Sequence, residues 1–315
     1  MAGRVLTVGT RGSALALEQA RRVRVRLEGE SELRVVRTGG DRFSEVPLGE
    51  KNPAGFFTKE IEDELLSGRI DLAVHSLKDL PTQLAPGLAF GAMLERDDPA
   101  DILLVRPDAQ EPGGRLPLKK GAVVGSSSER RSAMLRHFRP DLSILPIRGN
   151  VPTRVDKVRS GDFDAILLSR AGLERLRLVV DPLLACQLNP RAWPGAPGQG
   201  VIAVEVRQDD EEAIRRASGL NDPATVITVL AERSLLVAFG GGCHAPFGAY
   251  CEVGREASLA VVAAPGLGGG FIVERFSERD LENARTAAEA WVRSARAPLG
   301  TREEEWLCRP ARSWC

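Results

Sequence analysis

The sequence predicts an α/β protein with two similar doubly wound domains, followed by a smaller α+β domain. Three observations lead to this prediction. Strand and helix patterns alternate over the first two thirds of the chain, one strand-and-turn pattern occurs twice, and a long helix ended by glycines introduces the last third. With 315 residues and 43% hydrophobic composition, the chain is long enough for two or three domains with cores of their own.

The first elements show the alternation. Arg4–Gly9 is a short apolar run closed by glycine, and Ser13–Leu27 carries apolar residues at helical spacing. A second helix is predicted over 57–66, followed by a strand over 70–75. Strands interleaved with helices favour a parallel sheet that is covered on both faces.

One pattern recurs along the chain. Ser67–Ser76 reads as helix end, glycine turn, aspartate, apolar strand and serine, and Ser160–Ser169 repeats that order. Val8–Ser13 resembles Val124–Ser128 in the same way. We interpret the recurrence as two similar domains in tandem, although ordinary α/β punctuation would produce part of it. Twin domains of this kind bind ligands in a crevice at the carboxyl ends of their strands.

The last third predicts a smaller domain. A strand is expected over 201–206, after which Asp222 and Pro223 form a helix start. That helix should end near Phe239, because three glycines follow it. The remaining expected features are strands near 245–253 and 259–264, a turn over 265–270, a helix over 280–297, and linkers at 95–99 and 189–200.

Composition excludes several classes of protein. The 43 basic and 43 acidic residues cancel, which disfavours a nucleic-acid-binding or membrane-surface protein. No apolar run is long enough to span a bilayer, and the N-terminus lacks a signal-peptide core. Five cysteines without a C-x-x-C pair and only three histidines argue against a zinc site or a disulfide framework. We therefore expect a cytoplasmic protein without a metal.

Arginines gather where helices are predicted to begin. Residues 121–180 contain eleven basic and six acidic residues in an otherwise neutral chain. Helix N-termini attract anions, so a positively charged guanidinium group is unfavourable there unless an anion lies between the two. A surface salt bridge explains any single arginine better, whereas the group predicts a polyanion site. The arginines at predicted strand-end loops are Arg11, Arg130, Arg131, Arg148, Arg154 and Arg175.

Asp79 is the carboxylate that follows the strand over 70–75. It could cap the turn before Pro81 or pair with Lys78, and these readings are as good as a functional one. Among cations it would stay ionised, and it could then stabilise a cationic intermediate or accept a proton from one.

Cys243 follows three glycines, which allow close backbone approach and leave room for a bulky adduct on an exposed thiol. A plain loop residue remains an equally good reading, and the adjacent His244 is weak support for a Cys–His nucleophile. His75, in an apolar strand, is interpreted as a core histidine. Gly198-Gln199-Gly200 is interpreted as a hinge rather than a phosphate loop.

The chain resembles the porphobilinogen deaminase (hydroxymethylbilane synthase) family from about residue 4 to about residue 253. Ordered motifs carry the resemblance: VGTRGSALALEQA from Val8, TGGDR from Thr38, FTKEIEDELLSGRIDLAVHSLKDLPT from Phe57, ERDDPADILL from Glu95, VGSSSERR from Val124, IRGNVPTR from Ile147, DAILLSRAGLERL from Asp164, APGQG from Ala196 and AERSLLVAFGGGC from Ala231.

The resemblance implies three domains with a periplasmic-binding-protein-like pair. These are residues 1–97 with 198–218, residues 98–197, and residues 219–315. It also implies a transferase that carries a dipyrromethane cofactor on Cys243 through a thioether. Four porphobilinogen units are condensed head to tail onto this primer with loss of ammonia, and water releases linear hydroxymethylbilane.

The resemblance further implies roles for individual residues. Asp79 would be the catalytic carboxylate, and no residue would bind a metal. The implied cofactor-binding residues are Cys243, Lys78, Asp79, Ser127, Ser128, Arg130, Arg131, Arg148 and Gly172. The implied substrate-binding residues are Arg11, Ser13, Gln19, Phe57, Arg148, Arg154, Arg175 and Gln199. Departures from the family pattern at Ala54, Ala100 and His244 affect only local loop contacts.

The expected partners follow from the same resemblance. Porphobilinogen is the substrate, nucleic acid and membrane are not partners, the protein is a monomer, and the product passes to uroporphyrinogen-III synthase. Two other classes remain open at this point: a non-enzymatic anion-binding protein of the periplasmic type, and a transferase or hydrolase that uses Cys243 as a nucleophile.

Overall fold

A computed structural model describes residues 4–38, 58–113, 115–242, 245–266, 270–294 and 308–310. Residues 308–310 are described by their backbone only. The chain divides into two compact units. Unit 1 contains residues 1–97 and 200–227, and unit 2 contains residues 98–199 and 228–315. The chain passes between the units at three places, and the third, at 227–228, falls inside a helix, α8 (Pro223–Phe239).

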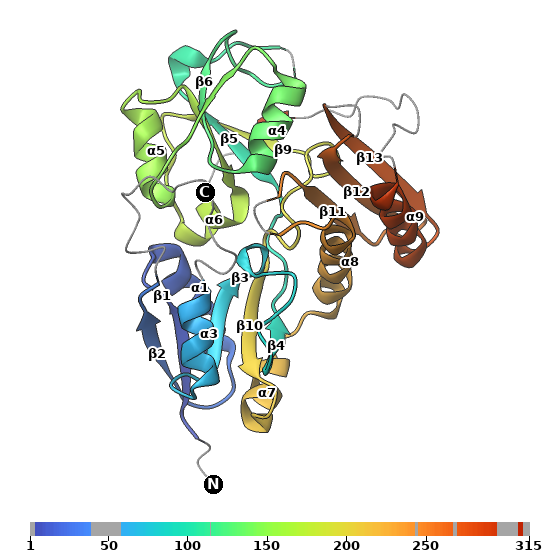
Figure 1. Cartoon of the computed structure of the whole chain (residues 1–315). Helices are drawn as coiled ribbons and strands as arrows, with labels where there is room; N and C mark the ends of the chain where they lie inside the picture. The colour runs from blue at the N-terminus through green and yellow to red at the C-terminus, as the bar shows by residue number, and fades with distance from the viewer. Residues whose placement is uncertain are drawn as a thin grey trace. The chain divides into compact units, whose positions relative to one another are not determined.

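Unit 1 is built on a five-stranded sheet with the order β2-β1-β3-β10-β4 (Figure 1). β1, β2 and β3 are parallel, as predicted, but β10 runs antiparallel to both of its neighbours. The expectation of a purely parallel sheet is therefore wrong for β10. This strand belongs to a segment far along the chain, and it needs no crossover helix to reach its place. The strands are β1 (Leu6–Arg11), β2 (Ser31–Val36), β3 (Leu72–Ser76), β4 (Leu88–Met93) and β10 (Ile202–Arg207).

Helices cover both faces of this sheet. One buried cluster joins α1 (Ala14–Arg26) and α7 (Glu211–Ser218) to the sheet through residues such as Val23, Val74 and Ala213. On the other face, Ile61 and Leu65 of α3 (Lys59–Leu66) pack against Ile70 and Ala73. The predicted doubly wound arrangement is confirmed for unit 1.

Unit 2 contains a six-stranded sheet with the order β14-β9-β5-β8-β6-β7. β6 is parallel to β7 and β8, whereas β5 is antiparallel to β8 and β9. Apart from β14, the strand order and directions repeat those of unit 1, so the predicted duplication is confirmed. The elements are β5 (Asp101–Val105), η2 (Pro107–Ala109), β6 (Val123–Gly125), α4 (Glu129–Phe138), β7 (Ser143–Leu145), α5 (Val151–Arg159), β8 (Ala165–Ser169), α6 (Arg170–Leu176), β9 (Leu184–Leu188) and β14 (Cys308–Pro310).

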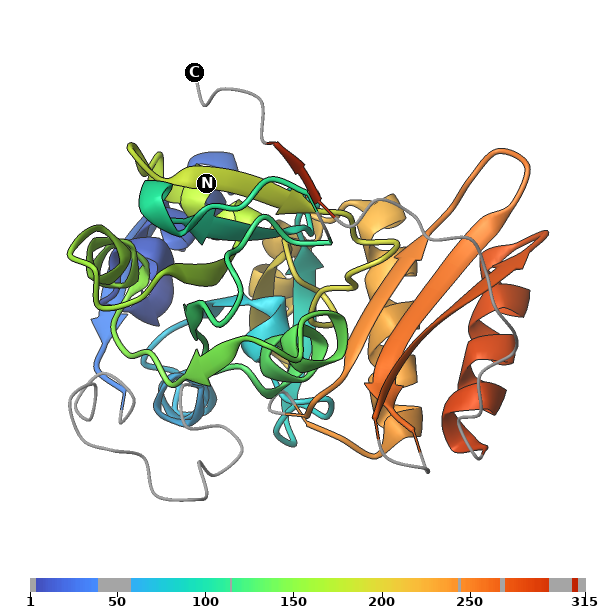
Figure 2. The same ribbon diagram turned by 90° about the horizontal axis from the view of Figure 1, so that it is seen from above.

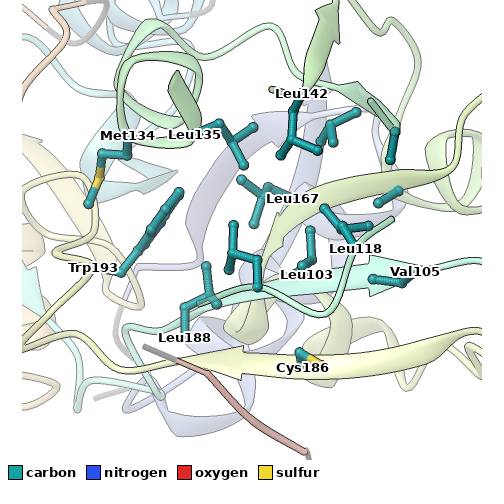
Figure 3. Packing of buried hydrophobic residues seen from close by; sticks show 14 of the residues in the cluster. Leu103, Val105, Leu118, Met134, Leu135, Leu142, Leu167, Cys186, Leu188 and Trp193 are labelled. Atoms are coloured by element: carbon teal, nitrogen blue, oxygen red, sulfur yellow. The ribbon is translucent and has the colours of Figure 1, made fainter. Parts of the chain in front are cut away.

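The core of this sheet centres on Trp193 (Figure 3). Its indole is fully buried and stacks on Phe138, with 5.7 Å between the ring centroids. Leu103 and Leu167 approach from the sheet, and Leu135 approaches from α4. Each such side chain contributes about 1.5–3 kcal/mol through burial.

The predicted small α+β region also belongs to unit 2 (Figure 2). Alternate residues of its central strand, Ala260, Val262 and Ala264, share a core with α8 and α9. Ala263 points to the opposite face and joins the core that surrounds Trp193. The elements are β11 (Gly248–Glu252), β12 (Ser258–Pro265), β13 (Phe271–Glu278) and α9 (Leu281–Arg293), with the strands antiparallel.

Candidate active site

In unit 1, predicted site residues gather at the carboxyl ends of β1 and β3. Arg11 is the last residue of β1, and the Ser13 hydroxyl caps α1 by accepting the N–H of Ala16 at 3.3 Å. Gln19 is buried in α1, where its side-chain amide donates to the Ser76 hydroxyl at 2.8 Å. Because β1 and β3 are neighbours, this hydrogen bond connects the two strand-end loops.

Asp79 lies in η1 (Leu77–Asp79), a single 3-10 turn directly after β3. Buried Leu77 anchors the turn, and its N–H donates to Val201 O at 3.0 Å. The Asp79 side chain is exposed, and within the described ranges no hydrogen bond or ion pair holds its carboxylate. The structure therefore shows neither the turn cap nor the Lys78 pair that the sequence left open. Lys78 itself is half-buried.

His75 is buried beneath this turn, as expected of a core histidine. Its Nε2 lies 2.9 Å from Glu205 Oε2 on the neighbouring strand β10, and both side chains are almost completely shielded from solvent. Burial, reinforced by the Glu205 charge, raises the pKa of Glu62 on α3. His75 and Glu205 are buried, whereas Glu62 is half-buried.

In unit 2, the arginines that begin α4 surround a single carboxylate, Asp101. Arg130 donates from Nη1 to Oδ2 at 2.9 Å, and Arg131 donates from Nη2 to Oδ1 at 2.7 Å and from Nε to Oδ2 at 3.2 Å. Trp193 Nε1 and Gln199 Nε2 donate at 3.0 and 2.9 Å. Burial would raise the pKa of Asp101, but the two guanidinium groups outweigh it and hold this pKa far below the usual range.

Arg148 and Arg154 complete a cationic cluster with Arg131. Burial and the charges of Arg131 and Arg148 lower the pKa of Arg154 to about 10, so its guanidinium remains charged at neutral pH. Its Nε donates to Gly149 O at 2.8 Å. In the part of the chain that the structure describes, no carboxylate pairs with Arg148 or Arg154. Like charges held together without a counter-charge form a binding site for an anion.

The hydroxyl-rich loop before α4 is rigid. Ser128 caps α4 by accepting the N–H of Arg131 at 3.4 Å. Ser127 donates to Ile147 O at 2.6 Å and accepts from Ile147 N at 3.0 Å. These bonds join the loop to the segment that carries Arg148.

Two predicted residues lie inside α6. Gly172 and Arg175 are both buried there. Arg175 is in the last turn of the helix, where the dipole favours a cation. The expectation that these arginines lie at helix N-termini is therefore wrong for Arg175, because α6 begins at Arg170, directly after β8.

Gln199 ends a segment that the sequence presents as a linker. Its side-chain amide donates to Pro99 O at 2.7 Å as well as to Asp101, and the N–H of Gly198 donates to buried Glu232 at 2.8 Å. Hydrogen bonds thus hold this segment within unit 2 up to Gln199. The next residue, Gly200, has φ +93° and accepts the N–H of Asp97 at 3.1 Å. The chain crosses between the units at 97–98 and at 199–200, and again inside α8 at 227–228.

Two predicted residues, Phe57 and Cys243, lie outside the described residues. Across the described ranges, no group of three or more His, Cys, Asp or Glu side chains could hold a metal ion. Every helix in those ranges is too short or too polar to cross a bilayer.

Sequence reasoning missed Asp101 and Glu232. Both are fully buried. A signal was available for Asp101, since it begins an apolar strand and a buried charge requires a partner. Glu232 lies in an ordinary helical pattern that carries no such signal.

Comparison with known proteins extends these observations. Residues 6–215 match the family model described as porphobilinogen deaminase, dipyromethane cofactor binding domain, and residues 226–265 match the porphobilinogen deaminase C-terminal domain. Porphobilinogen deaminase from Syntrophobacter fumaroxidans is 43% identical over 80% of this chain and 82% of its own. The Rubrobacter xylanophilus protein of that name is 43% identical over 95% and 98%.

One solved structure that aligns with this chain is the Bordetella pertussis BvgS VFT2 domain, a double mutant. It is 15% identical and covers 69% of this chain and 86% of that chain, with a TM-score of 0.41. The family-model match spans more than half of the chain, and the relatives are similar over most of their length. The chain belongs to the porphobilinogen deaminase family.

Proposed function

We propose that this chain is a hydroxymethylbilane synthase, a transferase that condenses four porphobilinogen units onto a dipyrromethane primer and releases the linear product with water. The observation that carries the proposal is the cluster of Arg131, Arg148 and Arg154, which lies within the region matched by the cofactor-binding family model. Asp101 pairs with Arg131, whereas among the described residues no carboxylate pairs with Arg148 or Arg154. Each pyrrole unit bears an acetate and a propionate, so a chain of pyrroles is a polyanion.

The residues present fit the cofactor. Guanidinium groups bind carboxylates bidentately. An added carboxylate would offset the burial and the neighbouring charges of Arg131 and Arg148, which together lower the pKa of Arg154. When bound, the dipyrromethane supplies the pyrrole carbon to which the first substrate unit is joined. Cys243 would hold it through a thioether, which resists hydrolysis. Further cofactor contacts are proposed for Lys78, Ser127, Ser128, Arg130 and Gly172.

Asp79 would act on the substrate. Loss of ammonia from porphobilinogen leaves positive charge on the pyrrole, and an ionised carboxylate stabilises that charge. The same carboxylate can accept the proton that the attacking ring carbon loses. Its exposed position on a turn fixed by Leu77 leaves both oxygens available. Substrate carboxylates and pyrroles would be bound by Arg11, Ser13, Gln19, Phe57, Arg148, Arg154, Arg175 and Gln199.

We further propose a monomer that works in the cytoplasm and passes its product to uroporphyrinogen-III synthase. The three-domain division at 97–98, 197–198 and 218–219 is proposed with it. Neither nucleic acid nor membrane is needed for the reaction.

Ammonia release tests the proposed reaction. Purified protein given porphobilinogen should release one ammonia for each unit consumed and should form a linear tetrapyrrole. The Cys243→Ser variant is the control and should do neither. Consumption of porphobilinogen without ammonia release, or equal activity of the Cys243→Ser variant, contradicts the proposal.

A further inference from the structure

The Arg131 side chain is unusually constrained for a ligand-binding arginine. Nε and Nη2 both donate to Asp101, and Nη1 donates to Leu167 O at 3.0 Å. All three nitrogens are therefore fixed, and the plane of the guanidinium is set by the protein alone. A guanidinium has five N–H groups, so two remain to meet a ligand.

Asp101 also sets the charge of this region. Arg130 and Arg131 are buried, and Asp101 neutralises one of their two positive charges. One positive charge remains, and it adds to those of Arg148 and Arg154. A buried ion pair usually contributes little net stability, because desolvation offsets the attraction. A role in orienting Arg131 explains why this carboxylate is buried beside the cluster.

We propose that Asp101 is a positioning residue for the cofactor: its carboxylate holds the Arg131 guanidinium in the orientation in which Arg131, Arg148 and Arg154 together receive a dipyrromethane carboxylate. The inference rests on the proposed function of these arginines. Asp101 itself does not touch the cofactor and acts through Arg131.

The chain offers a matched control in Asp164. Its carboxylate also accepts from an arginine, with Arg106 Nη2 at 2.8 Å, and from the N–H of Val123 at 2.8 Å. Asp164 directly precedes β8, at the strand end opposite to the loops that carry the cluster. An Asp→Asn change there removes a carboxylate that pairs with arginine in the same unit without touching Arg131.

The test compares cofactor loading in three apoproteins: wild type, Asp101→Asn and Asp164→Asn. Each is incubated with porphobilinogen, and intact mass is followed over time at a temperature where circular dichroism shows all three folded. We expect Asp164→Asn to load at the wild-type rate and Asp101→Asn to load about tenfold more slowly or worse. The kcat of the molecules that do load should change less than the loading rate.

A milder variant covers the case in which Asp101→Asn does not fold. Trp193→Phe removes one hydrogen bond to Asp101 and leaves every charge in place. We expect loading to slow about threefold, because Trp193 Nε1 is one of the donors that hold the Asp101 carboxylate in place, with kcat per loaded molecule unchanged.

The outcomes separate the two proposals. A wild type that gains no mass contradicts the proposed function, and this inference falls with it. A wild type that loads, together with folded Asp101→Asn protein that loads equally fast, contradicts this inference alone. If Asp101→Asn does not fold, wild-type loading by Trp193→Phe contradicts it instead.

Discussion

The two doubly wound sheets share strand order and directions but bury different polar contacts on their antiparallel strands. In unit 1, Glu205 of β10 meets the imidazole of His75. In unit 2, Asp101 of β5 meets Arg130 and Arg131, which stay charged. The same topology therefore supports two electrostatic designs.

The difference indicates a division of labour. Unit 2 keeps an excess of positive charge in Arg131, Arg148 and Arg154, which suits it to holding anionic pyrrole chains. In unit 1, the carboxylate of Asp79 is exposed on a turn that a buried residue fixes in place. On this account, unit 2 supplies the cationic cluster for the pyrrole chain. Unit 1 supplies Asp79 for the proton and charge chemistry, together with the proposed substrate contacts of Arg11, Ser13 and Gln19.

The largest effect is expected from Asp79→Asn. It should lower kcat by about a hundredfold or more, since positioned acid–base groups contribute about 10²–10⁴-fold, while cofactor loading by intact mass stays normal. Asp63→Asn, at an exposed position on α3, is the control and should have little effect. Near-normal turnover by Asp79→Asn would contradict the proposal that Asp79 carries out the proton and charge chemistry.

Next in size is Glu205→Gln, which tests whether the unit 1 pair is structural. The change alters the carboxylate that lies 2.9 Å from His75 Nε2 inside the sheet. A buried polar group that loses its partner costs about 1–3 kcal/mol, so the melting temperature should fall by several degrees. Cofactor loading below that temperature should remain at the wild-type rate. Slow loading in folded Glu205→Gln protein would contradict the division between the units.

Arg154→Met should weaken anion binding. A hydrogen bond to a charged group contributes about 1.5–3 kcal/mol, so KM for porphobilinogen or the loading time should rise roughly tenfold or more. Arg136→Met, at an exposed position on α4, serves as the control. Equal behaviour of the two variants would show that the cluster is not the anion site.

The smallest effect concerns the dependence of stability on pH. Burial and the charge of Glu205 raise the pKa of Glu62, so the folded state favours the protonated carboxyl. Wild type therefore loses stability as pH rises from the pKa of Glu62 in the unfolded chain through its pKa in the folded protein. At pH 8, the Glu62→Gln variant should melt at a higher temperature than wild type, and its free energy of unfolding should be larger by about 1 kcal/mol or less after solvent screening. The two proteins should melt alike near pH 4. A Glu62→Gln variant that is less stable than wild type at pH 8 would contradict the expected direction of this effect.

Local patterns made much of this fold predictable. Apolar periodicity predicted α1, and the recurring glycine-to-serine pattern predicted the second sheet. The Asp222-Pro223 start and the glycines after Phe239 predicted α8. The direction of β10 could not be read in this way, because it depends on how the chain returns to unit 1 after residue 199. Direction in a sheet is a property of the tertiary path rather than of the residues in the strand.

The sequence predicts the candidate site with the same limitation, because it shows local patterns but not tertiary contacts. The conflict of charges at helix N-termini predicted an anion site that includes Arg148 and Arg154. The charges of these two residues interact in the structure, and the anion site itself stays a prediction. The partner of Arg130 and Arg131 could not be found, because Asp101 is about thirty positions away in the chain and meets them only when β5 lies beside α4. Local patterns reveal which residues carry charge, whereas packing decides which charges are neutralised.

The most direct test of the account is the intact mass of the purified, active protein. The account predicts an excess equal to two condensed porphobilinogen units, which is absent from the Cys243→Ser variant. An active protein whose mass equals that of its polypeptide alone would contradict it.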